Sequence, residues 1–298
     1  MYRNKQDDTS ITTTQYTMLK RNKFTGDLRE IHDAPSSLYV RGEMPDGPAV
    51  AIVGTRRPTQ YGEEVTYRLA FELAQSGITI VSGLAYGIDT IAHRAAVAAG
   101  GKTVAVLGCG LDVCYPAANR RLAEQIIQSG GAIVSEYSDG TPPLKHHFPA
   151  RNRIIAGLSR GVLVTEADAR SGSLITAHLA LDENRIVMAV PGAITNPRSE
   201  GPNNLIRAGA VPILGAADIW TALGLMRPQE KTQVTQRYAV GTLEHTLLSA
   251  LAERAQSAES LAVKAQRPVQ QILEILSLLE LTGEVVAMGG GQWIARSS

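Results

Sequence analysis

The feature that most constrains the fold is a series of short, continuous apolar runs, most of which are separated by helical patterns. The first run, AVAIVG, spans residues 49–54 and ends in glycine, and the others are GITIVSG, KTVAVLG, GAIVSE, RGVLVTE and RIVMAVPG. Short runs of this kind are typical of strands buried on both faces, and their alternation with amphipathic helices predicts a parallel sheet. We therefore expect an α/β fold, an extended Rossmann-like, doubly wound domain with a mostly parallel sheet.

The chain divides into four predicted segments. Residues 1–35 have weak periodicity and are interpreted as a flexible N-terminal segment, after which Leu38–Val40 is expected to pair with a sheet edge. The Rossmann-like domain is predicted over residues 36–226. Residues 227–241 are polar without an apolar face and are interpreted as a linker. Residues 242–298 show three helical patterns and then two strands around a glycine turn, which is the outline of a winged helix.

Charge and composition exclude several classes of protein. The net charge of +1 argues against a bulk polyanion binder but leaves room for a local basic patch. No apolar run approaches the ~18 residues of a membrane span, and the polar start is not typical of a secretory signal. The two cysteines, Cys109 and Cys114, fit a reducing compartment, and two thiols alone make a poor metal site. We expect a cytoplasmic protein with no metal and no cofactor.

The stretch VGTRR at residues 53–57 is a candidate anion site. It follows the first apolar run and leads into a helical pattern, and such a turn presents free backbone N–H groups and a helix dipole. Arg56 adds a full charge and a fork that matches phosphate, although a surface arginine in a loop is the alternative. A dinucleotide fingerprint would need G-x-G-x-x-G, and neither this turn nor GCGLDV, with Val113 in the third glycine's place, supplies it.

Small-residue turns follow other strands in the same way. In RSGSLITA, the residues Ser171, Gly172 and Ser173 are able to form a backbone nest with added hydroxyl donors, and helix capping by serine alone is the alternative. All these turns follow strands, so they are expected at the carboxyl edge of the sheet, where open α/β sheets bind ligands.

The stretch from Thr141 to Arg160 carries charge of one sign. It holds one Lys, three Arg and two His, with no Asp or Glu, and it includes the aromatic Phe148. A positive groove with a ring on which a base stacks is typical of single-stranded nucleic acid binding. We expect Lys145, Arg151 and Arg153 to neutralise phosphates and Phe148 to stack on a base, without sequence preference. His146 and His147 are left unassigned.

Catalysis is not indicated. Glu136, Glu166 and Asp168 follow strands and are possible bases, but no nucleophile elbow, metalloprotease motif or P-loop accompanies them. We therefore expect no enzyme and no catalytic residues. The alternative is a nucleotide-processing Rossmann-like hydrolase, for which the stretch TEADARSGSLITA lacks the expected P-G-G-x-G-T-x-x-E loop.

The C-terminal module lacks the charge of a DNA-reading winged helix. Its third helical pattern carries Glu274 and Glu280 and no basic residue, and from Leu243 onward six Glu outnumber four Lys and Arg. We expect this module to contact protein or to regulate, and a duplex-DNA-binding regulator remains the alternative.

Six stretches occur in an order that resembles one family. VGTR, SGLAYGID, GCGLDVCYP, SEYSDGTPPLKHHFPARNRIIAGLS, SGSLITA and NNLIRAGA together resemble the DprA (Smf) family of bacterial DNA-processing proteins over roughly residues 36–220. The resemblance implies an extended Rossmann fold that binds single-stranded DNA, forms a homodimer and helps to load the RecA recombinase during natural transformation. DNA uptake, recombination and defence all remain open as host roles.

The resemblance also assigns residues. The family's strand-binding arginine falls on Arg56, and its lysine and phenylalanine, three apart before the RNR motif, fall on Lys145 and Phe148. The full set of predicted contacts to single-stranded DNA is Gly54, Thr55, Arg56, Lys145, Phe148, Arg151, Asn152, Arg153, Ser171, Gly172 and Ser173.

Overall fold

The computed structural model describes residues 16–24, 26–225, 238, 241–253, 256–282, 284–288 and 291–295. The chain divides into two compact units, Met1–Met226 and Arg227–Ser298, which are described separately. The predicted linker at residues 227–241 lies outside the described residues, except for Tyr238 and Gly241. No helix within the described ranges is long and apolar enough to cross a membrane.

The first unit is built on a mostly parallel sheet, as the apolar runs predicted. Nine described strands lie in the order β1-β2-β6-β5-β4-β3-β7-β8-β9. Pairing is parallel from β6 to β9, whereas β2 pairs antiparallel with both β1 and β6. The bounds are β1 Thr17–Lys20, β2 Ser37–Gly42, β3 Ala49–Val53, β4 Thr79–Ser82, β5 Thr103–Leu107, β6 Ala132–Ser135, β7 Gly161–Val164, β8 Ile186–Ala189 and β9 Val211–Pro212.

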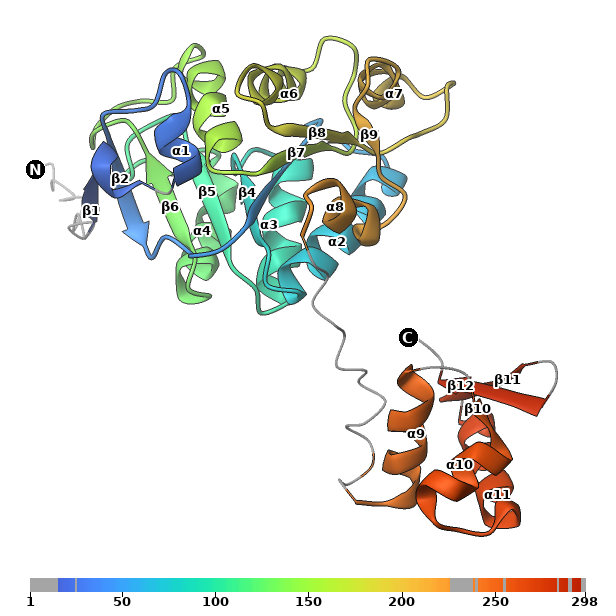
Figure 1. Ribbon diagram of the computed structural model, residues 1–298. Helices are drawn as coiled ribbons and strands as arrows, with labels where there is room; N and C mark the ends of the chain where they lie inside the picture. The colour runs from blue at the N-terminus through green and yellow to red at the C-terminus, as the bar shows by residue number, and fades with distance from the viewer. Residues whose placement is uncertain are drawn as a thin grey trace, which may run out of the picture. The chain divides into compact units, whose positions relative to one another are not determined.

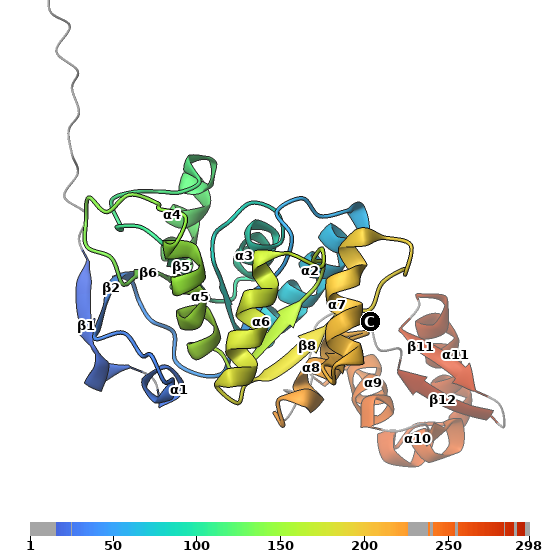
Figure 2. The ribbon, with the colours of Figure 1, turned by 90° about the horizontal axis from the view of Figure 1, so that it is seen from above.

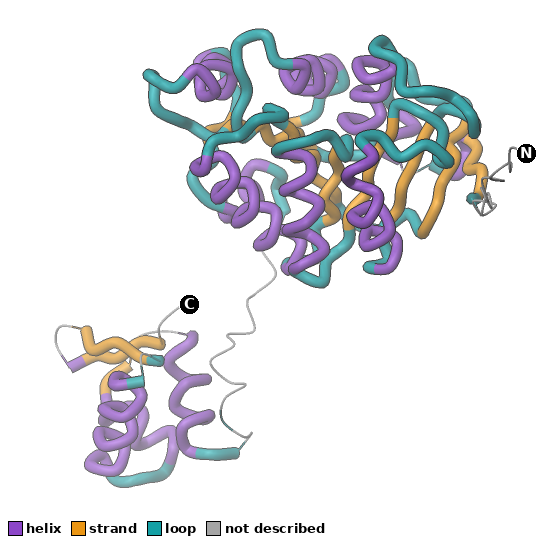
Figure 3. The backbone as a smooth tube through the Cα atoms, turned by 180° about the vertical axis from the view of Figure 1, so that it is seen from behind, coloured by secondary structure: helices purple, strands orange, loops and turns teal. Residues whose placement is uncertain are grey.

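Helices cover both faces of this sheet (Figures 1 and 3). One face is covered by α1 Gly26–Glu30, α5 His147–Gly157, α6 Gly172–Asp182 and α7 Glu200–Arg207, of which α5, α6 and α7 lie side by side in Figure 2. The other is covered by α2 Gln60–Gln75, α3 Ile88–Ala98, α4 Arg120–Gln128 and α8 Ala216–Ala222. Short 3-10 turns are η1 Arg21–Lys23, η2 Ala117–Asn119 and η3 Pro197–Ser199.

The two helical layers explain why the strands are continuously apolar. In β3, Ala51 and Val53 pack with the α5 and α6 layer, whereas Val50 and Ile52 pack with the α2 and α3 layer. Successive side chains of a strand point to opposite faces, so a strand between two layers has no polar face. The predicted doubly wound architecture is confirmed.

The N-terminal interpretation needs a correction. The described part of residues 1–35 forms β1, η1 and α1, and Phe24, Leu28 and Ile31 are buried in the core. Phe24 follows η1, Leu28 lies within α1 and Ile31 follows α1, so the three residues come from a short, irregular segment. The segment is too short for a periodic pattern to stand out in the sequence. The predicted pairing of Leu38–Val40 is confirmed, because β2 pairs with β6, and β1 lies beyond it.

The strand order creates a switch point beside the central strand. After β3 the chain adds β4, β5 and β6 on one side, and it then returns to add β7, β8 and β9 on the other. The connection after β3 enters α2 on one face, and the connection after β7 enters α6 on the opposite face. Diverging loops of this kind open a crevice at the carboxyl ends of the strands.

The second unit is the predicted winged helix. It contains α9 Leu243–Glu253, α10 Ala258–Ala265 and α11 Val269–Leu281, with strands β10 Gln256–Ser257, β11 Val285–Met288 and β12 Gln292–Ala295. The strands form a sheet in the order β10-β12-β11. Leu251, Leu261 and Leu276 are fully buried in a core of its own. Ser257 caps α10, because its side chain accepts a hydrogen bond from the Ser260 N–H.

Candidate nucleic-acid interface

A cavity of about 640 Å³ opens at the switch point and is called the central cavity here. Its walls come from the turn after β3 and from the N-terminal ends of α5 and α6, so segments far apart in the sequence share it. The predicted residues that line it are Gly54, Arg56, Lys145, Phe148, Arg151, Asn152, Ser171, Gly172 and Ser173. Thr55 and Arg153 are the predicted residues that do not.

The turn after β3 is shaped by close backbone contacts. A Cβ atom on Gly54 would lie 2.6 Å from Ile88 Cγ1 and 2.7 Å from the Glu166 carbonyl oxygen, so a side chain does not fit. Thr55 is buried, its N–H donates to the Glu166 carbonyl at 2.6 Å, and its hydroxyl accepts from the Arg57 N–H. Thr55 therefore holds the turn, and the exposed Arg56 follows it.

The glycine loop between β4 and α3 supports this turn. Gly87 has φ of +75°, and a Cβ there would lie 2.4 Å from the Thr55 carbonyl oxygen. The same carbonyl accepts from the Ile88 N–H at 3.2 Å, the first residue of α3. The loop before α3 thereby fixes the backbone that carries Arg56.

Phe148 lies among cations and a second ring. The guanidinium carbons of Arg56 and Arg151 lie 5.9 Å and 6.0 Å from its ring centroid, within the range of cation–π interaction. The Tyr115 ring lies 5.6 Å away, tilted by 39°. Phe148 is half-buried and Lys145 is exposed. Tyr115 also lines the central cavity, and the sequence stretch GCGLDVCYP carries no spacing signal that singles it out.

Arg151 faces the cavity but is bound to the fold. Only 5% of the residue is exposed, and its guanidinium donates to the Val106 carbonyl and, at 2.8 Å, to the Gly83 carbonyl. Burial lowers the pKa of Arg151, and the charge of the nearby Asp89 acts in the opposite direction. Arg151 joins α5 to the ends of β4 and β5, and its predicted contact with phosphate stays a prediction.

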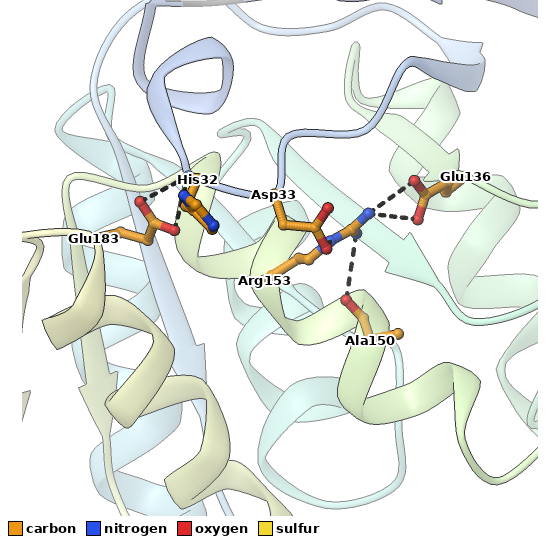
Figure 4. A network of polar contacts seen from close by, with 6 residues as sticks. All are labelled: His32, Asp33, Glu136, Ala150, Arg153 and Glu183. Carbon is orange, nitrogen blue, oxygen red and sulfur yellow. Dashed lines mark hydrogen bonds and ion pairs between the residues drawn. The ribbon is translucent and has the colours of Figure 1, made fainter.

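Arg153 braces α5 from the other side (Figure 4). Its guanidinium donates to both carboxylate oxygens of Glu136, at 2.8 Å and 2.9 Å, and to Asp33 at 2.9 Å. Burial by itself lowers the pKa of Arg153, but the hydrogen bonds and charges of Glu136 and Asp33 outweigh it and raise the pKa. Because two carboxylates already hold this charge, Arg153 has a structural role, and its predicted phosphate contact is not carried into the site proposed below.

Capping and cavity lining coincide at the start of α6. The Ser171 side chain caps the helix by accepting from the Ser173 N–H, and the two hydroxyl oxygens lie 2.8 Å apart. The Asn152 amide donates to the Gly172 carbonyl at 3.5 Å and its oxygen accepts from Arg151 Nε at 3.2 Å. Asn152 therefore ties the middle of α5 to the beginning of α6.

The carboxylates considered as bases are occupied by structure. Glu166 is 1% exposed and accepts from the Thr59 N–H at 2.8 Å, the Thr59 hydroxyl at 2.6 Å and the Asn196 amide at 3.3 Å. It anchors the start of α2, where negative charge is favoured. Glu136 pairs with Arg153, and Asp168 is exposed. Within the described residues, no group of three His, Cys, Asp or Glu is placed to hold a metal ion.

The two adjacent histidines have different surroundings. His147 is buried, its Nδ1 lies 3.1 Å from the Gly108 carbonyl oxygen, and its ring stacks on Tyr137 at 4.0 Å between centroids. His146 is exposed, with its ring edge-on to His147 at 4.5 Å. His147 thus fills the turn before α5, a role that its place in a basic run concealed.

Both cysteines are free thiols. Cys109 follows β5, is buried and donates to the Val113 carbonyl at 3.2 Å. Burial raises the pKa of the Cys109 thiol to about 11 and also raises that of Cys114. Neither thiol has the lowered pKa of a reactive cysteine.

Comparisons with solved structures find the same fold. The X-ray structure of DNA processing protein A from Streptococcus pneumoniae has a TM-score of 0.65 and 45% identity, covering 70% of this chain and 74% of that chain. A structure of DNA processing protein A from Helicobacter pylori, described in terms of a unique single-stranded DNA binding mode, has a TM-score of 0.64 and 35% identity, covering 71% and 96%.

Sequence comparisons agree. Protein Smf of Escherichia coli (strain K12) is 41% identical over 267 residues, which cover 87% of this chain and 71% of that protein. DNA processing protein DprA of Streptococcus pneumoniae is 49% identical over 195 residues, covering 65% and 68%. The family model described as DNA recombination-mediator protein A matches residues 15–224, and the DprA winged helix domain matches residues 235–291. With both units matched, this chain belongs to the DprA (Smf) family of DNA recombination-mediator proteins.

Proposed function

We propose that this chain binds single-stranded DNA in the central cavity without sequence preference. The observation that carries the proposal is the convergence of Arg56, Lys145 and Phe148 from separate segments on one cavity. Cations and a half-buried ring in one groove match the alternation of phosphates and bases along a strand. Phosphates and base faces occur in every sequence, so this mode of binding does not discriminate between sequences.

Each residue has its own part in the proposed complex. Arg56 and Lys145 are exposed and neutralise phosphates, and Phe148 stacks on a base. The backbone and hydroxyl groups of Ser171–Ser173 offer donors at the N-terminal end of α6, where anions are favoured. Arg151 adds positive charge from the cavity wall while remaining bound to the fold.

The family supports the wider role that we propose. Its model is described as a DNA recombination-mediator protein, and relatives carry the name DNA processing protein. We propose that the chain acts as a non-enzymatic homodimer that loads RecA onto single-stranded DNA in DNA recombination, including natural transformation. DNA and RecA as partners place this activity in the cytoplasm.

The central test measures fluorescence anisotropy of a labelled dT oligomer. Lys145→Glu should weaken binding by tenfold or more and lower the salt slope by about 0.7 for each phosphate that is no longer neutralised. The matched control is Lys102→Glu, which makes the same charge change on an exposed residue just before β5, at the opposite edge of the sheet. Equal affinities for the two variants would show that the central cavity is not the DNA site.

The same titration separates the competing functions. Single-stranded DNA should bind more tightly than duplex DNA, and nicotinamide dinucleotides should not bind. A hydrolase would instead turn over nucleoside monophosphates in a manner abolished by Glu166→Gln. The three hydrogen bonds that Glu166 accepts leave it poorly placed for that chemistry. A strong duplex preference would favour the winged helix as a duplex-DNA regulator.

A further inference from the structure

A second cavity, of about 680 Å³, lies beside the central cavity and is called the lateral cavity here. Its lining residues come from the beginning of α2, the N-terminal half of α3 and the η2 turn. None of the predicted contacts except Arg56 lines it. The residues that carry its chemistry are Arg56, Arg57, Tyr86 and Arg94, opposite Glu63.

The lateral cavity has an excess of available positive charge. Arg57 and Arg94 are both exposed, and among the described residues no ion pair or side-chain hydrogen bond engages either guanidinium. Glu63 is the one carboxylate that the described part of the chain contributes to the lining, and it faces three arginines. This contrasts with Arg151 and Arg153, whose hydrogen bonds are made within the fold. Guanidinium groups without internal partners in a cavity suit phosphate, which they bind through paired N–H donors.

Arg56 lies at the boundary between the two cavities, since it lines both. A small hollow between them is lined by Arg56, Phe148, Tyr115 and Tyr86. Phe148 and Tyr115 also line the central cavity, whereas Tyr86 also lines the lateral one. Their shared linings place the three rings in sequence from one cavity to the other.

The rings of Tyr115 and Tyr86 are both open to solvent. Tyr115 is 43% exposed and Tyr86 is 52% exposed. An exposed aromatic ring contributes little to the stability of the fold, because little of its surface is buried. A ring beside a positive groove contributes about 1–3 kcal/mol of binding free energy for each base that stacks on it. Exposed rings and cations without internal partners thus line adjoining cavities, and these are the two kinds of group that bind the bases and phosphates of a polynucleotide strand.

We propose that the DNA strand held in the central cavity continues past Arg56 into the lateral cavity. Tyr115 and Tyr86 are further platforms for bases along this path, and Arg57 and Arg94 bind the phosphates at its far end. The inference rests on the proposed single-stranded DNA binding and deepens it. The proposed DNA site is therefore longer than the central cavity alone, and Arg56 lies in its middle and not at its end.

The test compares dT oligomers of about 4 and about 12 nucleotides, which bracket much of the range of site sizes in single-strand-binding folds. Only the longer oligomer is expected to reach the lateral cavity. Arg94→Glu should weaken its binding about tenfold and leave the shorter oligomer within about twofold, because charge-assisted contacts of this kind are worth about a factor of ten. Tyr86→Ala should act in the same selective manner.

Arg68→Glu is the matched control, because Arg68 is an exposed arginine on α2 that lines neither cavity. Arg94→Gln replaces Arg94→Glu if circular dichroism shows that the latter is misfolded, and it should lower the salt slope for the longer oligomer by about 0.7.

The outcomes separate this inference from the proposed function. Selective loss for the longer oligomer supports the continuous path. Unchanged binding of both oligomers to Arg94→Glu and Tyr86→Ala overturns it, while loss of both on Lys145→Glu still upholds the central site. Equal loss for both lengths in Arg94→Glu also overturns it, because Arg94 would then act on the central cavity. If the unsubstituted chain binds neither oligomer, the proposed function itself is wrong.

Discussion

At the scale of single residues, arginines that look alike in the sequence do different work. Arg56 is exposed between two cavities, Arg151 is buried against backbone carbonyls, and Arg153 is held by two carboxylates. The sequence shows their charge, but their partners come from distant segments: Asp33 is 120 residues away from Arg153 along the chain. Only the fold distinguishes a cationic side chain that is exposed for a ligand from one that is already paired within the protein.

Arg153→Gln tests this distinction. It should lower the free energy of unfolding by about 1 kcal/mol, because Asp33 is 80% exposed and Glu136 only partly buried, so solvent screens the pairs. The salt slope of dT binding should stay unchanged, since the charge removed was neutralised internally, whereas Lys145→Gln should reduce it by about 0.7. A comparable reduction in Arg153→Gln would return Arg153 to the set of phosphate contacts.

At the scale of elements, a buried histidine links α3 to β5. His93 is 0% exposed, its Nδ1 lies 2.7 Å from the Thr103 hydroxyl oxygen, and that hydroxyl donates to the Ile80 carbonyl. The imidazole is therefore the donor to Thr103. Its Nε2 is buried without a hydrogen-bond partner. Burial lowers the pKa of His93 to about 3, with a smaller contribution from the charge of Arg151.

This histidine predicts a loss of stability in acid. Below its ordinary pKa of about 6.5, the unfolded chain binds a proton that the folded chain does not accept until about pH 3. The contribution of the neutral His93 to the free energy of unfolding is complete above pH 6.5. It should fall by about 2 kcal/mol by pH 5. Urea unfolding at pH 7 and pH 5 measures this loss of free energy. Between these two pH values, the free energy of unfolding of His93→Gln should fall by about 2 kcal/mol less than that of the unsubstituted chain. Identical pH dependence in both proteins would mean that His93 is protonated in the folded state.

At the scale of the whole molecule, strand order brings the site together. The turn after β3 and the start of α6 are more than 100 residues apart, yet β3 and β7 are neighbours, so their connections meet at one crevice. The winged helix has a separate core, and α11 carries no basic residue. The single-stranded DNA site that we propose therefore belongs to the first unit.

The proposed role of the full chain predicts an effect on RecA. On single-stranded DNA coated with single-strand-binding protein, the chain should shorten the lag in RecA filament formation, followed by ATP hydrolysis. Lys145→Glu should lose this effect, and Lys102→Glu should keep it. Light scattering on the same samples should give twice the 31.8 kDa mass of one chain. An unchanged lag with intact dT binding would refute RecA loading and leave the DNA site standing.

The sequence by itself determined the α/β class, the buried strands, the winged helix and the segments that supply the central cavity. These follow from local patterns: apolar runs that end in glycine and one-signed charge are visible over a few residues. The tertiary structure decided which charges are free, that Tyr115 lies beside Phe148, and that β1 and α1 complete the sheet and its core. Pairing, burial and ring contacts join segments distant in the sequence, so local pattern alone does not specify them.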